Sequence, residues 1–174
     1  MLTASWLLFG MGWLGAADIV FFHKRAHRLH AHPPARAELV THSLRGPTYC
    51  ALFALVPNFE FHGAWFGVLL GILGIDLAIS IADFWLEPGS RRALGGLPRG
   101  EYLLHVLLAM LFGALVLATL RDGAGWLGMP TELRWIDTGA PVLLRVALGI
   151  MAPIVLLSGV GDALAVRRLG SRSV

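Results

Sequence analysis

The sequence contains little charge and almost no cysteine. Only 14% of its 174 residues are charged and 56% are hydrophobic, whereas charged residues fill about a quarter of the positions in a typical soluble domain. The single cysteine, Cys50, excludes an internal disulfide framework. The net charge of +3 comes from basic residues scattered among short segments, so we expect no nucleic-acid partner. This composition predicts an integral membrane protein.

The first apolar run also lacks the basic residues that precede the apolar part of a secretory signal peptide. Lys24, Arg25 and Arg28 follow the run instead of preceding it. We therefore interpret residues 3–22 as a first membrane helix that is retained in the protein.

Five segments are long and apolar enough to form membrane helices, which need about 20 mainly apolar residues. Pro88 and Gly89 are expected to end the third of them, because proline cannot continue a helix without losing a hydrogen bond. The predicted fold class is an all-α membrane bundle forming one transmembrane domain over residues 1–174. The predicted helices are 3–22, 35–57, 64–87, 101–121 and 141–166.

The basic residues are distributed unevenly across this topology. Eleven of the fourteen lie in segments on one side of the predicted membrane, and only Arg121, Arg134 and Arg145 lie on the other. Cytoplasmic segments of membrane proteins are enriched in lysine and arginine. We therefore predict a multi-pass protein of the inner (cytoplasmic) membrane, with its N-terminus outside and its C-terminus in the cytoplasm.

Carboxylate and imidazole side chains recur at the cytoplasmic end of four predicted helices. On three of these helices they form pairs four residues apart, and such a pair shares one helix face. Several acids in one bundle would repel each other, and a bound dication relieves that repulsion. The three pairs are Glu38 with His42, Asp83 with Glu87, and Glu101 with His105.

These pairs predict a metal site, for which Asp76, His23 and Asp18 are additional candidate ligands. Carboxylate and imidazole ligands without thiolate suit iron, manganese or zinc. The alternative is a polar core in which salt bridges hold the same acids, since Arg36, Arg45 and Arg99 lie close to them in sequence.

The order of these pairs resembles the ferritin-like dimetal carboxylate proteins, in which Glu-x-x-His pairs and single glutamates from four helices hold two metal ions. The pairs here, Glu38/His42 and Glu101/His105, are spaced four residues apart instead of three, and other donors are aspartates. The resemblance implies two first-row metal ions, iron or manganese, with zinc as the alternative. It also implies non-haem oxidoreductase chemistry.

We therefore expect a membrane-embedded dimetal oxidoreductase whose lipid-like substrate enters from the surrounding membrane lipids near the cytoplasmic interface. One alternative is a proton or metal-ion transporter or channel, because Asp76 lies deep in the third helix and intramembrane acids often form relays. Another is an accessory subunit of a larger membrane complex, or an oligomer, with a purely structural polar core.

Overall fold

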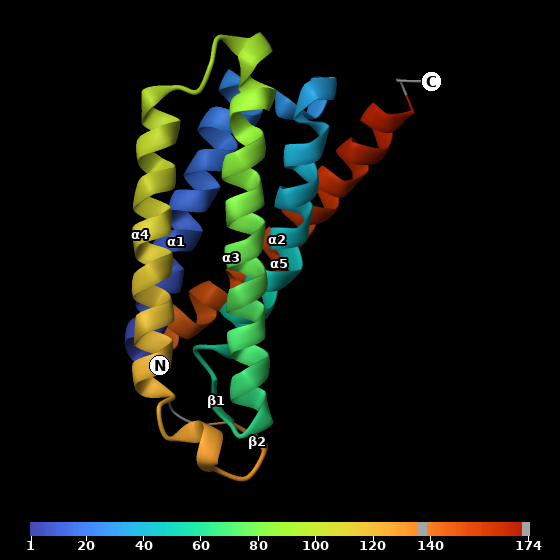
Figure 1. Cartoon of the computed structure of the whole chain (residues 1–174). Coiled ribbons are helices and arrows are strands. Elements are labelled where there is room, and N and C mark those ends of the chain that lie inside the picture. Colours follow the sequence, from blue (N-terminus) through green and yellow to red (C-terminus); the bar gives the residue numbers. More distant parts are fainter. Residues whose placement is uncertain (136–138, 172–174) are drawn as a thin grey trace.

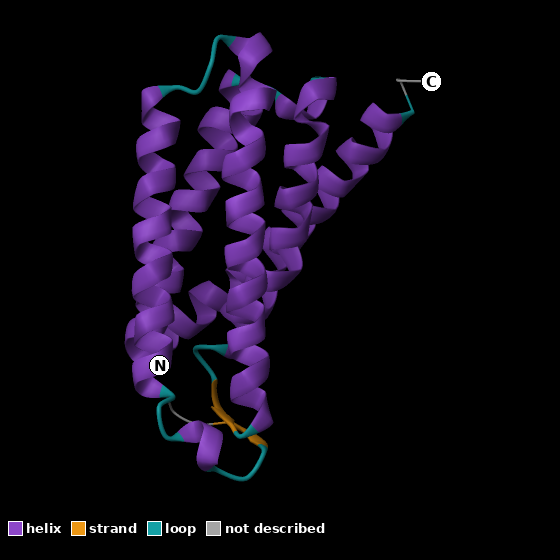
Figure 2. Ribbon diagram, in the orientation of Figure 1, coloured by secondary structure: helices purple, strands orange, loops and turns teal. Residues whose placement is uncertain are grey.

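The computed structural model describes residues 1–135 and 139–171, and these form a bundle made almost entirely of helices (Figures 1 and 2). The predicted all-α fold class is confirmed. The long helices are α1 (Leu2–Asp18), α2 (Arg36–Leu55), α3 (Ala64–Arg91), α4 (Arg99–Asp122) and α5 (Val142–Gly170). The N-terminus and the last turns of α5 lie at opposite ends of the bundle (Figure 1).

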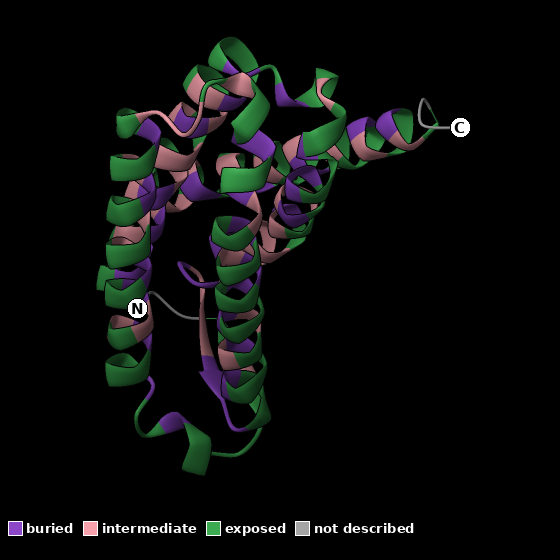
Figure 3. Cartoon of the chain, turned by 45° about the horizontal axis from the view of Figure 1, so that its top comes forward, coloured by how far each residue is buried: buried purple, intermediate pink, exposed green. Residues whose placement is uncertain are grey.

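Four of the helical segments are long and apolar enough to cross a membrane: Leu2–Ala26, Ala64–Leu94, Arg99–Asp122 and Val142–Gly170. The outward faces of the helices are exposed (Figure 3) and carry large apolar side chains such as Leu143, which is 80% exposed. Soluble proteins rarely expose apolar surface on this scale. Length and composition therefore support a membrane bundle, while five crossings and their orientation remain predictions.

The helices pack in two groups. α1 packs mainly against α4, and α2 packs mainly against α5 and α3. Helices α2 and α5 approach most closely at Gly46 and Gly159, where a Cβ atom on Gly159 would lie 3.0 Å from the Cα of Gly46. Small residues allow this kind of close helix contact in membrane proteins.

At the end where the N-terminus lies, a small antiparallel sheet closes the bundle (Figure 1). Strand β1 (Phe59–His62) pairs with β2 (Glu132–Trp135), and Phe61 and Trp126 are buried there. This sheet was not predicted, because residues 58–63 and 122–140 lie between the predicted helices and no strand was assigned to them. Each strand has only four residues, so its alternation of apolar and polar side chains is too short to be recognised in the sequence.

Two helix ends differ from the predictions at the opposite end of the bundle. α3 continues through Pro88 to Arg91, followed by a 3-10 turn (Arg92–Leu94). α1 continues as a π-helix over Ile19–Ala26, followed by the 3-10 turns Leu29–Ala31 and Pro33–Ala35. Proline is tolerated in membrane helices where local adjustments satisfy the freed backbone groups. The prediction that Pro88 and Gly89 end the third helix was therefore wrong.

Candidate functional site

A network of polar side chains, buried except for the half-buried His42 and Arg45, joins α1, α2, α3 and α4, mostly at the end of the bundle opposite the small sheet. We call it the polar network. Each of its carboxylates is at most 6% exposed. Its members are the acids Asp18, Glu38, Asp76, Asp83, Glu87 and Glu101, the histidines His23, His27, His42 and His105, and the arginines Arg45 and Arg91.

The π-helix explains how the first helix contributes to this network. In an α-helix, residues five apart point about 140° away from each other, so Asp18 and His23 would not share a face. In a π-helix the backbone bonds span five residues, as the 2.9 Å bond from the His27 amide to the Phe22 carbonyl shows. His23 Nε2 consequently lies 3.3 Å from Asp18 Oδ2, and His27 Nε2 lies 3.1 Å from Glu101 Oε2. The involvement of His27 was not predicted.

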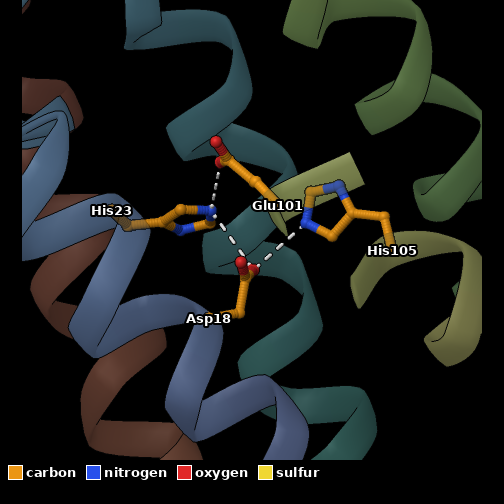
Figure 4. Close-up of side chains that lie close together, drawn as sticks. All are labelled: Asp18, His23, Glu101 and His105. Atoms are coloured by element: carbon orange, nitrogen blue, oxygen red, sulfur yellow. Dashed lines mark hydrogen bonds and ion pairs between the residues drawn. The ribbon is translucent and has the colours of Figure 1, made fainter. Parts of the chain in front are cut away.

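Four residues converge on one point, which we call the first ligand group (Figure 4). Their donor atoms all lie within 4.8 Å of one another. His105 Nε2 is 3.2 Å from Asp18 Oδ2, and His23 Nε2 is 3.6 Å from Glu101 Oε1. Ligands of a tetrahedral ion with bonds of about 2.0–2.2 Å are separated by about 3.3–3.6 Å. Three of the separations in the group, 3.2, 3.3 and 3.6 Å, are close to this spacing, so Asp18, His23, Glu101 and His105 form a candidate site for one first-row metal ion.

Several donor atoms in this region lack hydrogen bonds within the described part of the chain. Asp18 Oδ1 and His23 Nε2 are buried without a hydrogen-bond partner. His105 Nδ1 and Glu87 Oε1 lie 3.2 Å apart, yet neither makes a hydrogen bond there. Buried polar atoms in folded proteins nearly always have partners, so each exception needs an explanation. A metal ion in the first ligand group supplies one for His23 Nε2, whereas the Asp18 oxygen that faces His23 and His105 is Oδ2 and not the unpartnered Oδ1.

A second ligand group consists of His23, Glu38 and His42, whose donor atoms also lie within 4.8 Å of one another. The rings of His23 and His42 are stacked, with centroids 4.5 Å apart and an angle of 16° between their planes. His23 thus belongs to both groups and lies between α2 and α4.

Arg91 is the principal residue that sequence analysis missed. Its side chain is fully buried, with Nη1 donating to Glu38 Oε2 at 2.7 Å and Nη2 donating to Glu101 Oε1 at 2.5 Å. Nη2 also lies 3.8 Å from Glu87 Oε1. The hydroxyl of Ser90 donates a further hydrogen bond to Glu38. Glu38 and Glu101, both predicted as metal ligands, are therefore salt-bridged. Their partner is Arg91 and not the arginines that lie close to them in sequence.

Arg45 holds the acids nearer the middle of α3. Its Nη1 donates to Asp83 Oδ2 at 3.1 Å, and Asp83 also accepts from Thr41 Oγ1 at 2.6 Å. Asp76 lies 3.8 Å from Arg45 Nε and accepts from the Tyr49 hydroxyl at 3.2 Å. Asp83, 3.3 Å from His42 Nε2, adjoins the second ligand group without belonging to it. Asp76 and Glu87 likewise belong to neither group.

The charges within the polar network do not balance with neutral histidines. Six buried carboxylates face two guanidinium groups, which leaves a net charge of −4. Burying uncompensated charge is strongly unfavourable. The compensation comes from protons on histidines or carboxylates, from bound cations, or from both.

A large cavity adjoins the network. Its volume is about 870 Å³, which is within the range of about 300–1,000 Å³ typical of ligand pockets. Asp18, His23, His42 and His105 line its polar end, and most of its remaining lining is apolar and comes from all five long helices. The first ligand group thus faces an apolar space inside the bundle.

Comparisons with models of known protein families, with curated proteins and with solved structures found no match. The similarity to ferritin-like proteins therefore rests on the types and spacing of the donor residues alone, and the chain is assigned to no family.

Proposed function

We propose that this protein is a membrane-embedded, metal-dependent oxidoreductase that acts on a lipid-like substrate. The observation that carries the proposal is the convergence of Asp18, His23, Glu101 and His105 on one point, where Asp18, His23 and His105 also line the apolar cavity. Two imidazoles and two carboxylates make a ligand set that suits iron or manganese, with zinc as the alternative.

The stacked histidines favour metal over full protonation. Neutralising the network without metal requires four added protons, and placing them all on its histidines makes both His23 and His42 cationic. Two unit charges about 4 Å apart repel by about 4 kcal/mol at an effective dielectric constant of 20, and these rings are 4.5 Å apart. A dication bound by neutral imidazoles avoids that repulsion and compensates two of the excess negative charges at once.

The second ligand group is the place for a second metal ion in this proposal. Two dications would supply four positive charges, which matches the excess negative charge of the network. His23 belongs to both groups, and a neutral imidazole has one nitrogen free to bind a metal, so His23 would serve only one of the two ions. Arg91 pairs with both Glu38 and Glu101, so it competes with an ion in either group. The first ligand group offers four donors and the second offers three, so we assign the primary site to the first ligand group and a weaker site to His23, Glu38 and His42.

The cavity supports a lipid-like substrate. Its apolar wall excludes water from the ligand groups, and exclusion of water protects reactive intermediates from side reactions. A metal ion at this position would supply the redox chemistry, while the chain would hold the substrate beside it. The cavity lining includes the strongly exposed apolar residues Trp13, Ile81 and Ile154, which suits contact with a lipid-like substrate.

The two alternatives from the sequence are less well supported. A transport path needs polar groups along its length, yet the described cavity lining beyond Asp76 toward the small sheet is apolar, as at Met11, Phe53 and Phe112. A purely structural core agrees with the ion pairs of Arg45 and Arg91, but it leaves the charge of the remaining acids and the unpartnered atoms of the first ligand group unexplained.

The test is the metal content of protein purified in detergent without chelators. Iron, manganese and zinc per chain should fall sharply in His105→Ala and Asp18→Asn. His62→Ala is the matched control, because His62 is similarly buried and pairs with Glu60 at the opposite end of the bundle. Metal-free, folded wild-type protein would refute the proposal, as would equal metal loss in the control.

A further inference from the structure

A second, smaller cavity of about 270 Å³ lies between the segment that follows α1 and the C-terminal half of α5. Its lining is basic, with Lys24, His30 and Arg168 contributed by these two elements, and Asp162 is the acid among the lining residues. With a neutral His30, these side chains carry a net charge of +1. The smaller cavity therefore suits a group with a single negative charge.

The two cavities are continuous. Ile19, Leu157 and Ser158 line both, and so do Lys24 and Asp162. A basic mouth therefore leads into an apolar interior. On α1, the lining of the large cavity extends from Phe9 to Asp18, which is roughly 13 Å of helix at 1.5 Å per residue, and it continues to Val20 in the π-helix. The combined space has the shape and the polarity of an amphiphile with an anionic head and a long apolar tail.

We infer that this combined space binds an anionic membrane lipid. Its head lies against Lys24, His30 and Arg168, and one acyl chain extends into the large cavity past Asp18, His23 and His105. The inference specifies the substrate class of the proposed enzyme and rests on that proposal for the reaction, whereas the binding itself needs no metal.

Charge decides which lipids bind. An acyl chain leaves one apolar environment for another when it moves from bilayer to cavity, so chain burial contributes little selectivity. Each lysine or arginine near an anionic head strengthens binding by about fivefold. Replacing both Lys24 and Arg168 should therefore weaken binding by about thirtyfold.

The experiment uses lysophosphatidylglycerol with a photoreactive palmitoyl chain, added to the full-length protein in detergent. Cross-linked peptides should map to cavity-lining residues such as Phe112 and Met151. Labelling should drop about thirtyfold in the Lys24→Gln/Arg168→Gln variant. The matched control is Arg25→Gln/Arg167→Gln, which removes two exposed neighbours that do not line the cavities. Its labelling should equal that of wild type.

Three results would overturn the inference: adducts confined to outward-facing residues such as Leu143, equal labelling by the zwitterionic lysophosphatidylcholine analogue, or protection by inorganic phosphate as effective as by unlabelled lipid. The last result would identify a site for a free anion.

Repeating the labelling on chelator-treated protein separates the lipid inference from the metal proposal. Labelling that persists in protein without metal supports the lipid site whatever the outcome of the metal analysis.

Discussion

Replacing Arg91 with methionine should destabilise the protein more than any other single change to a basic residue. Arg91 is fully buried, and its two terminal nitrogens donate to Glu38 and Glu101. The variant leaves both carboxylates buried without their cation and changes the net charge of the polar network from −4 to −5. Removing one partner of a buried ion pair typically costs about 3–5 kcal/mol. We expect a loss of this size in the free energy of unfolding.

The assay is equilibrium unfolding of metal-free protein in mixed micelles, followed by tryptophan fluorescence. Arg92→Met is the matched control, because Arg92 is the exposed neighbour of Arg91 and exposed charges contribute at most about 1 kcal/mol. Arg91→Lys should be intermediate, since lysine keeps the charge but lacks the planar fork that reaches two carboxylates at once. Equal stabilities of Arg91→Met and Arg92→Met would refute the reasoning.

The same variant also tests the link between charge and metal. Without Arg91, Glu38 and Glu101 are free to act as ligands, so added Mn²⁺ should stabilise Arg91→Met more than it stabilises wild type. Stabilisation by a ligand follows its affinity for the folded state. If Mn²⁺ restores none of the lost stability, Arg91 does not compete with a cation in this network.

Three further predictions concern other parts of the molecule. Gly159→Leu should lower the free energy of unfolding by about 1–3 kcal/mol, because the added side chain forces α2 and α5 apart. Gly149→Leu is the control and should cost less, because there is open space where the new side chain would begin. His42→Ala should remove only the weaker metal and leave the primary ion bound, and loss of both ions would show that the two groups are not separate sites. A reporter fused after Val174 should be cytoplasmic and one inserted near Gly125 external, and finding both on the same side would exclude five crossings.

Spacing four residues apart was sufficient to find four of the six residues in the two ligand groups. The pairs on α2 and α4 share helix faces, so the structure brings Glu38, His42, Glu101 and His105 into the two ligand groups. This part was predictable because a regular helix fixes the relative directions of its side chains, whatever packs against it. The long apolar helices were predictable for a similar reason, since composition alone defines them.

The remainder depends on irregular backbone and on contacts between distant segments. The position of Arg91 follows from α3 continuing past Pro88, and a proline in sequence usually signals the opposite. The alignment of Asp18 with His23 needs a π-helix, which the usual period of 3.6 residues cannot reveal. The two short strands pair residues that lie far apart in the chain, such as Phe59 with Trp135, and no local pattern in the sequence encodes such a pairing.

The measurement that tests the central claim most directly is X-ray absorption at the metal edge of the purified, full-length protein. The first ligand group predicts a first-row ion bound only by nitrogen and oxygen at about 2.0–2.2 Å, with an imidazole contribution that decreases in His105→Ala and is unchanged in His62→Ala. A sulfur ligand, a spectrum without imidazole, or the same spectrum in His105→Ala would contradict the site proposed at Asp18, His23, Glu101 and His105.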